Sequence, residues 1–445
     1  MIHLGSNHFA LDIGSTSIKG CVLDVESGQI AGVCTRPFPA PMGNLPSSSI
    51  EIDPRAVLEV VESIVDELTS EMGSQCHGWI CGQMGGVILA DDRGRAKSNY
   101  LSWRDQRSLV SGGSGRCTLD RLREDWPEPI MASLGRELQP GSTSTLLHWL
   151  SEHRQLRDGV MPLSIADFVI ANVARQPGRM HGTHAIGLLD LQKDDWHYEA
   201  FERIGLGDLW WPELIRDASQ IALWKRGDRT ISLHGAFGDQ QSALLGARLA
   251  SDELSINIST GSQVSMLTDS FRSGPYQTRK YFGNQWLNTV THLPAGRSLN
   301  ALMQLLTELS EAESVPLERP WKTVQEKMES VAETDLQANI AYFASPVGKS
   351  GTLENMTTEN LSVGHLFLAA CVSMANNYET AAKRLSSRQV WSQLALSGGL
   401  AQSLPRLVSL IQSRFKKPIR ESIGEETLLG MLQLAQQHTI QSSSL

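Results

Sequence analysis

Two stretches of the chain repeat one pattern of apolar and small polar residues. Phe9–Asp24 reads FALDIGSTSIKGCVLD, and Ser255–Met266 reads SINISTGSQVSM. In each stretch an apolar run leads into a short tip of glycine and hydroxyl residues, and a second apolar run follows. The pattern predicts a β-hairpin in each half of the chain, and its repetition indicates a duplicated fold.

Apolar residues at helical spacing predict several helices. The first begins at Asp53-Pro54, where Asp can serve as the N-cap and Pro suits the first helical position, and residues 57–68 carry its apolar face. The same spacing predicts helices at Ile165–Ala174, Leu299–Leu309, Ser362–Leu385 and Thr427–Gln436.

Two further strands are expected to meet glycine-rich turns. Gly78–Leu89 reads GWICGQMGGVIL, which predicts a strand that glycines interrupt. In Ala395–Arg414 a short strand is expected to lead into Gly398-Gly399, with a helix that begins near Pro405. A Gly-Gly turn before a helix lets a flat ring or a ribose lie on the backbone.

A single acid lies at another junction of strand and helix. His234–Ala247 reads HGAFGDQQSALLGA; Arg229–Leu233 before it can form a short strand, and Ser242–Leu249 has helix-forming character. Asp239 therefore lies on a glycine-flanked turn, where a ligand can approach the backbone closely. An acid in this position can accept a proton from a bound hydroxyl. It can equally cap the helix, and this window alone does not separate the two hypotheses.

The composition restricts the class of protein. A chain of 445 residues is too long for one ordinary core and suits two domains. Apolar residues make up 41% and charged residues 20%, as in soluble globular proteins. The net charge of -9 gives no indication of a nucleic-acid partner. No apolar run is long enough to span a membrane.

Cysteine and histidine usage argues against a disulfide framework or a zinc site. The six cysteines form no CxxC pair, and the N-terminal residues lack the pattern of a secretory signal, so we expect a cytoplasmic protein. His181 and His184 have the spacing of half a metal site. Because no third ligand lies at motif spacing, we expect them in a loop or at the surface.

Two short segments carry candidate ligand contacts. Backbone N–H groups and hydroxyls at the tip Gly14–Ser17 can cradle a phosphate, and Asp12 could hold a hydrated magnesium ion. The signal is weak alone, because most such tips are plain turns. In Leu101–Arg107 (LSWRDQR), Trp103 offers an apolar face for a sugar ring and Asp105 can accept hydroxyl hydrogen bonds. The alternative is an exposed charged turn with one anchored Trp.

Together and in this order, these motifs resemble those of the FGGY carbohydrate kinases, a branch of the actin-like ATPase fold. DIGSTSIKG at Asp12–Gly20 is similar to the family's first phosphate motif, and STGS at Ser259–Ser262 to its second. The segment Gly235–Gly246 resembles the catalytic motif. The remaining matches are GQMGG at Gly82–Gly86 and WRDQR at Trp103–Arg107 to the sugar-contact motifs, and SGGLAQS at Ser397–Ser403 to the adenosine motif.

The resemblance implies an α/β fold of two actin-like (ribonuclease H-like) ATPase domains, residues 1–232 and 233–445, with a cleft between them. It implies an enzyme that uses ATP and Mg²⁺, with Asp239 as the catalytic base and both Asp12 and Asp239 at the metal. The residues implied at ATP are Gly14, Ser15, Thr16, Ser17, Lys19, Thr260, Gly261, Gly398, Gly399 and Gln402. Those implied at the sugar are Gln83, Met84, Trp103, Asp105 and Gln240.

The implied reaction is phosphorylation of the terminal primary hydroxyl of a ketose. NISTGSQVS, GRSLNALM and NLSVGHLFLAAC, at residues 257–265, 296–303 and 360–371, resemble the sedoheptulokinase group, which makes sedoheptulose the first candidate. Ribulose, xylulose and glycerol are alternative substrates. A sugar-sensing protein of the same fold and an ATPase that acts on protein partners are alternative functions. A monomer or homodimer without membrane or nucleic-acid partners is expected.

The sequence departs from the family pattern in three respects. Gly85 stands where ketose kinases commonly have a histidine, so we expect space in the sugar pocket and a broader range of sugars. The opposing hypothesis is that a side chain from Gly182–Leu189 fills the gap. The usual GER triplet is replaced around Ser345–Lys349, and the chain is short for the family, which indicates trimmed loops.

Overall fold

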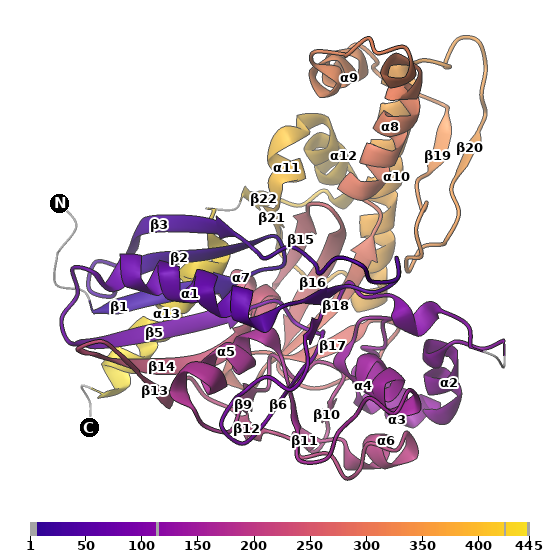
Figure 1. The fold of residues 1–445 in the computed structure, drawn as a ribbon. Coiled ribbons are helices and arrows are strands. Elements are labelled where there is room, and N and C mark those ends of the chain that lie inside the picture. Colours follow the sequence, from indigo (N-terminus) through magenta and orange to yellow (C-terminus); the bar gives the residue numbers. More distant parts are fainter. Residues whose placement is uncertain (1–6, 113–114, 422–423, 443–445) are drawn as a thin grey trace.

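The computed structural model describes residues 7–112, 115–421 and 424–442, which form two halves, each built on a six-stranded sheet (Figure 1). The first sheet comprises, in spatial order, β13 (Gln220–Arg226), β14 (Arg229–Gly238), β5 (Gln75–Gly82), β1 (His8–Ile13), β2 (Ser17–Asp24) and β3 (Gln29–Pro37). β1 pairs antiparallel with β2 and parallel with β5, and β5 is in turn parallel to β14.

The second sheet repeats this arrangement. It comprises, in spatial order, β17 (Gln277–Lys280), β18 (Trp286–Leu293), β16 (Ser262–Thr268), β15 (Glu253–Ile258), β21 (Gln393–Ser397) and β22 (Ile419–Glu421). β15 pairs antiparallel with β16 and parallel with β21, as β1 does with β2 and β5. Both predicted hairpins and the predicted duplication are therefore confirmed.

Alternation along β1 directs its side chains into two different cores. Phe9, Leu11 and Ile13 belong to the core that α1 (Pro54–Thr69) and α5 (Ile165–Ala174) cover. Ala10 belongs to a second core on the opposite face, beneath α13 (Glu426–Ser442), which is drawn in yellow behind the sheet in Figure 1. Successive side chains of a strand alternate between faces, so Asp12 faces this last helix of the chain.

Helices of the second half surround the other large core. This core joins β15, β16 and β21 to α8 (Gly296–Ala312), α9 (Pro320–Glu329), α10 (Val363–Leu385) and α12 (Pro405–Phe415). The five helices predicted from apolar spacing are all present, and Asp53 caps α1 by accepting a hydrogen bond from the Arg55 backbone N–H at 2.9 Å. The helix near Pro405 begins at that residue, and the glycine-interrupted strand ends at Gly82.

Short elements complete the described part of the chain. In the first half, α2 (Thr118–Asp125), α3 (Glu128–Ser133), α4 (Thr143–Glu152) and α6 (Tyr198–Arg203) share a third core. The other elements are β4 (Glu51–Ile52), β6 (Ile88–Ala90), β7 (Tyr100–Leu101), β8 (Met161–Leu163), β9 (Arg179–His181), β10 (Leu189–Asp190), β11 (Asp195–Trp196), β12 (Glu213–Ile215), α7 (Asp239–Gly246), β19 (Gln337–Asn339), β20 (Thr352–Glu354) and α11 (Gly399–Ser403).

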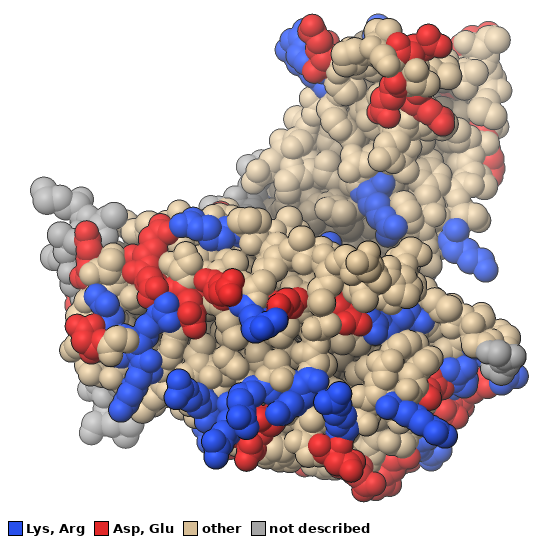
Figure 2. Space-filling model, viewed as in Figure 1, with Lys and Arg blue, Asp and Glu red and all other residues tan. Residues whose placement is uncertain are grey.

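The first sheet extends past the expected domain boundary. The expected division between residues 232 and 233 falls inside β14, which continues in the first sheet to Gly238. We therefore propose that the domain boundary lies after this strand. The surface is hollowed between the lobe that carries α8, α9 and α10 and the body formed by the first half (Figure 2). Within the described ranges no helix is long and apolar enough to cross a membrane, and the six cysteines are buried free thiols.

A cluster of histidines lies on the α13 side of the first sheet. His8 on β1 pairs with His77 on β5, and their rings stack with centroids 4.6 Å apart. His77 Nδ1 lies 3.1 Å from Nε2 of His234 on β14, whose ring stacks on Trp79 and contacts the ring of His438 on α13. Burial lowers the pKa of His8 to about 4 and that of His234 to about 3.

We expect His234 to make stability depend on pH. Its folded pKa lies below the unfolded value of about 6.5, so the unfolded chain binds more protons and stability falls as the pH drops from 7.5 to 5. For one fully buried histidine this loss is about 2 kcal/mol. His234→Phe keeps a ring against Trp79 but does not titrate. Urea unfolding at both pH values should therefore show a smaller pH-dependent loss in the variant.

The comparison between the two proteins isolates His234, because the other titrating groups are common to both. Burial raises the pKa of Asp167 to about 8, and this group acts in the opposite direction in both proteins. An equal loss of stability in wild type and variant between pH 7.5 and 5 would show that His234 is protonated in the folded state.

Candidate active site

The C-terminal ends of three parallel strands bring the two candidate acids together. Asp12 on β1 pairs with Cys81 of β5, and Cys81 pairs with Phe237 of β14. Asp239 follows two residues later, as the first residue of α7. Neighbouring strands lie about 4.8 Å apart, so the backbone of Asp12 lies about 10 Å from that of Phe237. Strand β5 lies between these two strands, and both acids lie at the same end of the sheet, where the negative charge of Asp12 acts on Asp239.

Asp239 has the environment of a general base. Its Oδ1 accepts a hydrogen bond from the Gln240 backbone N–H at 2.7 Å. Burial is the main cause that raises the pKa of Asp239 to about 7, and the negative charge of Asp12 adds to it. A carboxylate whose pKa lies near the working pH can both accept and release a proton. The N-cap of α7 is Gly238, so the hypothesis that Asp239 caps the helix is wrong.

Asp12 has one oxygen that is bound and one that is not. Oδ2 accepts a hydrogen bond from the Thr427 hydroxyl at 2.7 Å, whereas Oδ1 is buried without a partner. Burial raises the pKa of Asp12, and the Thr427 hydroxyl and the Lys19 charge oppose this shift. An orphaned carboxylate oxygen beside a second carboxylate fits a magnesium ion that keeps several waters and takes other ligands from phosphates. Within the described ranges no group of three or more potential ligand side chains forms a closed metal site.

The tip of the first hairpin, Gly14–Ser17, is a hydrogen-bonded turn, and an unpaired acceptor oxygen of Gln83 lies beside it. The Gly14 N–H donates to the Ser17 carbonyl at 3.1 Å, and Thr16 is exposed at the tip, with Ser15 half-buried. Gln83 Nε2 donates to the Gly14 carbonyl at 3.3 Å, while its Oε1 is buried without a partner. The structure thus brings Gln83, expected at the sugar, against the expected phosphate turn.

Lys19 does not present a free ammonium group at this turn. Its Nζ lies 2.8 Å and 3.0 Å from the two carboxylate oxygens of Glu425, at the start of α13. Both side chains are about one third exposed, so the pair lies at the rim of the site. A contact between Lys19 and a phosphate would require this ion pair to open, and the predicted contact stays a prediction.

The tip of the second hairpin meets the starts of two helices. Thr260 and Gly261 are exposed, and the Arg297 N–H at the start of α8 donates to the Thr260 carbonyl at 2.8 Å. Gly398, with φ of 92°, lies directly against the end of β15, where a Cβ would overlap with Ile258. This contact requires glycine. Gly399 has open space beside it, and Gln402 is exposed on α11, so the expected nucleotide residues of this half lie together.

Met84 lies next to the turn at Asp239, and Trp103 lies beside Gly85, the residue after Met84. A Cβ on Gly238 would be 2.6 Å from Met84 Sδ, which places this side chain against the residue before Asp239. Trp103 is 37% exposed, and its backbone packs against Gly141. A half-exposed indole on a fixed loop can offer its apolar face to a sugar ring.

Asp105 has a different environment from the one expected. It is fully buried, and its oxygens accept hydrogen bonds from the Ile50 and Arg107 backbone N–H groups at 2.7 and 2.8 Å. The Arg107 guanidinium also donates to both oxygens, at 2.9–3.0 Å. A sugar hydroxyl would have to share these saturated oxygens. We therefore propose that Asp105 fixes the loop that carries Trp103, and its contact with a sugar stays a prediction.

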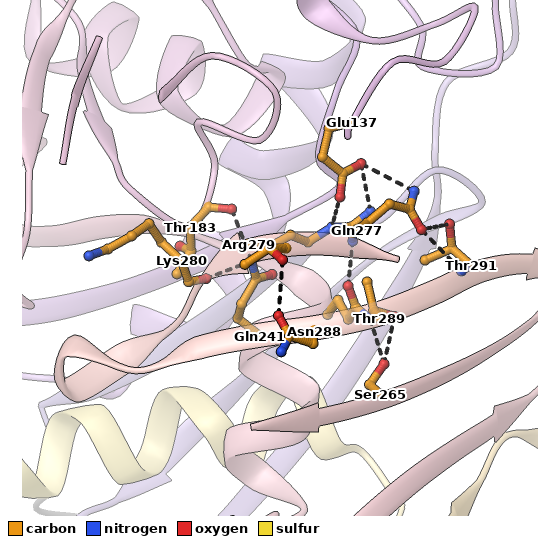
Figure 3. Close-up of polar contacts among 12 residues, drawn as sticks. Glu137, Thr183, Gln241, Ser265, Gln277, Arg279, Lys280, Asn288, Thr289 and Thr291 are labelled. Atoms are coloured by element: carbon orange, nitrogen blue, oxygen red, sulfur yellow. Dashed lines mark hydrogen bonds and ion pairs between the residues drawn. The ribbon is translucent and has the colours of Figure 1, made fainter. Parts of the chain in front are cut away.

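Gln240 belongs to a buried network that joins the two halves. Its Nε2 donates to the hydroxyls of Ser265 and Thr289, at 3.2 and 3.4 Å, and its Oε1 accepts from Arg279 on β17. Arg279 is also paired with Glu137, which follows α3 in the first half (Figure 3). Both ends of the Gln240 amide are thus occupied, so a sugar contact from Gln240 would also have to compete with existing partners.

The match with a family model decides the membership of the chain. Residues 8–246 of the 445 match the model described as the FGGY family of carbohydrate kinases, N-terminal domain. The chain belongs to the FGGY family of carbohydrate kinases. A glycerol kinase from Azorhizobium caulinodans is 25% identical over 257 residues, 53% of this chain and 49% of that protein. The match thus spans about half the length of this curated relative.

Solved structures of FGGY kinases share the fold over the whole chain. A gluconate kinase from Lactobacillus acidophilus has a TM-score of 0.84 and 18% identity, and covers 98% of this chain and 90% of its own. A xylulose kinase from Rhodospirillum rubrum has a TM-score of 0.83 and 15% identity, and the match covers 96% of this chain and 88% of that one. Plasmodium falciparum glycerol kinase with ADP has a TM-score of 0.78 and 17% identity, and the match covers 97% of this chain and 89% of that one. The expected α/β fold of two actin-like domains is therefore confirmed.

The turn before Asp239 is held by the segment His181–His184. His184 lies in a turn, in line with the expected loop, and His181 is the last residue of β9. The expectation of a surface position is wrong, because both histidines are buried. The Gly238 N–H donates to the Thr183 hydroxyl at 3.0 Å, and His184 Nε2 donates to the Phe237 carbonyl at 2.8 Å. Both polar ends of one peptide unit are thus satisfied by adjacent residues. A buried backbone requires such partners, and local spacing gives no sign of them.

The expectation of open space at Gly85 is wrong around the backbone. A Cβ at this position would lie 3.2 Å from Trp103 Cβ and 3.4 Å from the Gly141 carbonyl. Gly85 has φ of 74°, which a side chain tolerates poorly. The neighbours at the Cβ position are Trp103 and Gly141, and the filling of the space farther from the backbone by a side chain from Gly182–Leu189 stays a prediction. A histidine here would be both crowded and strained.

Removal of the Thr183 hydroxyl should destabilise the turn before Asp239. Thr183→Val keeps the shape and leaves the buried Gly238 N–H without an acceptor, which costs about 1–3 kcal/mol. We expect urea unfolding to show this loss, whereas Thr183→Ser, which retains the oxygen, should stay within about 0.5–1 kcal/mol of wild type. Equal stability of the Val and Ser variants would contradict the role of this hydrogen bond.

Proposed function

We propose that this FGGY kinase uses ATP to phosphorylate the terminal primary hydroxyl of a ketose, with sedoheptulose as the first candidate. The observation that carries the proposal is the position of Asp239. It directly follows β14, at the same end of the first sheet as Asp12, and its pKa is raised to about 7. A base of this kind suits a hydroxyl that must lose its proton while it attacks a phosphoryl group.

In the proposed reaction, the substrate hydroxyl oxygen bonds to the γ-phosphorus while the bond to the ADP oxygen breaks. The transition state of phosphoryl transfer is loose, so positioning and charge neutralisation supply most of the catalysis. Asp239 accepts the hydroxyl proton as the new bond forms, which contributes about 10²–10⁴-fold. After transfer, Asp239 releases this proton to water.

The hairpin tips are the proposed phosphate contacts. Gly14–Ser17 and Thr260-Gly261 would bind the β- and γ-phosphates through N–H and hydroxyl groups. Gly398-Gly399 and Gln402 would contact the adenosine. Magnesium, when bound, neutralises phosphate charge, and Asp12 would hold it through water at its free Oδ1.

Gln83, Met84 and Trp103 are the proposed sugar contacts. Gln83 has a free buried acceptor beside the proposed phosphate turn, Met84 supplies apolar surface against Gly238, and Trp103 supplies a half-exposed ring beside Gly85. Asp105 and Gln240 would hold the segments around the sugar pocket in place through their hydrogen-bond partners. The six buried free thiols support a reducing compartment, so we place the enzyme in the cytoplasm, as a monomer or homodimer.

Asp239→Asn should reduce turnover by at least about 100-fold while sugar affinity changes by less than about 3-fold. The amide keeps the shape of the carboxylate and removes its basicity. Asp228→Asn, at the exposed turn between β13 and β14, is the matched control and should behave as wild type. Turnover would be measured by ADP release and sugar affinity by calorimetry. An Asp239→Asn enzyme that retains a tenth of wild-type turnover would show that another group takes the proton.

A substrate panel tests the choice of sugar. Sedoheptulose should give the highest kcat/KM in an ADP-release assay that also includes ribulose, xylulose, gluconate and glycerol. Glycerol is the second candidate, because a glycerol kinase is the curated relative. A higher kcat/KM for another compound would replace sedoheptulose. Absence of turnover with every compound would favour a sugar-sensing protein of this fold.

A further inference from the structure

The last helix of the chain reaches the metal-side acid of the first half. Thr427, near the start of α13, donates its hydroxyl to Asp12 Oδ2 at 2.7 Å across 415 positions of the sequence. Thr427 is half-buried, and the remaining oxygen of Asp12 is buried and has no partner. The hydroxyl therefore engages one carboxylate oxygen and leaves the other available.

Close backbone packing fixes α13 at this position. A Cβ on Gly430 would overlap with the Ser242 backbone, and a Cβ on Gly246 would overlap with the Glu426 backbone. Gln433 Nε2 adds a hydrogen bond to the Leu245 carbonyl at 2.8 Å. α13 is thus in direct contact with α7, and the first residue of α7 is the proposed base.

The same helix pair therefore places both acids. α7 carries Asp239 at its first residue, and α13 holds Asp12 through Thr427. Magnesium requires near-octahedral geometry at short distances, so a carboxylate that holds it must keep a fixed orientation. Partners that orient a metal-binding side chain typically change metal affinity 10–100-fold when removed.

We infer that Thr427 is a positioning residue, which orients Asp12 so that its free oxygen faces the magnesium ion. The inference rests on the proposed function, in which Asp12 holds that ion. Glu425, two residues before Thr427, is paired with Lys19. Glu425 therefore holds the lysine, whereas Thr427 holds Asp12.

Metal affinity of Thr427 variants tests the inference without any sugar. The probe is Mn²⁺, titrated by electron paramagnetic resonance with saturating non-hydrolysable ATP analogue. Thr427→Val keeps the branched shape and removes the donor, and should raise the Kd for Mn²⁺ about 10-fold. Thr427→Ser retains the donor and should stay within about 2-fold of wild type.

Two further variants calibrate the measurement. Thr439→Val lies on the same helix, where the hydroxyl donates to the Ala435 carbonyl of its own turn, and it should leave the Kd unchanged. Asp12→Asn removes the charge itself and sets the upper limit of the effect. Thermal unfolding of each variant shows whether α13 remains docked.

The outcomes separate positioning from folding. A folded Thr427→Val protein with wild-type Mn²⁺ affinity overturns the inference. So does a Thr427→Ser protein that loses as much affinity as Thr427→Val, because the hydroxyl would then not be what matters. Absence of Mn²⁺ binding to the wild-type complex also overturns it. If Thr427→Val weakens Mn²⁺ binding but wild type phosphorylates no ketose or polyol, the inference stands and the proposed function fails.

Discussion

Two carboxylates at one end of the first sheet impose the constraint on which the rest of the active site depends. The negative charge of Asp12 disfavours ionisation of Asp239, and burial of Asp239 away from water disfavours it more strongly. Together they raise the pKa of Asp239 from 3.8 to about 7. Burial of the carboxylate is therefore the main reason why its pKa lies near neutral.

The surrounding groups offset this unfavourable arrangement unequally. Asp12 gains a hydroxyl from Thr427 and the charge of Lys19, both of which favour its ionised form. Asp239 gains the backbone N–H groups of Gln240 and of Asp239 itself, together with the charge of Arg279. Burial raises the pKa of both acids. We propose that the hydroxyl and the ammonium help Asp12 to remain charged beside a cation, while Asp239 exchanges a proton.

Local signals in the sequence predicted the local features of this fold. Each hairpin follows from an apolar run, a hydroxyl-rich tip and a second run, and the turn at Asp239 follows from its flanking glycines. The pairing of Glu137 with Arg279 and that of Thr427 with Asp12 could not be predicted, because each joins segments far apart in the chain. The same applies to Asp105, whose sequence neighbourhood read as exposed while tertiary packing buried it with Arg107.

The duplicated architecture also explains why the halves depend on each other. Without α13 the first sheet would expose Ala10, Cys21 and Trp79 on one face, and these residues form a core only with the last helix. Removal of α13 would expose this apolar surface to water. It would also remove the Thr427 hydroxyl that binds Asp12. The last helix thus completes the core on this face of the first sheet and supplies the hydrogen-bond partner of Asp12.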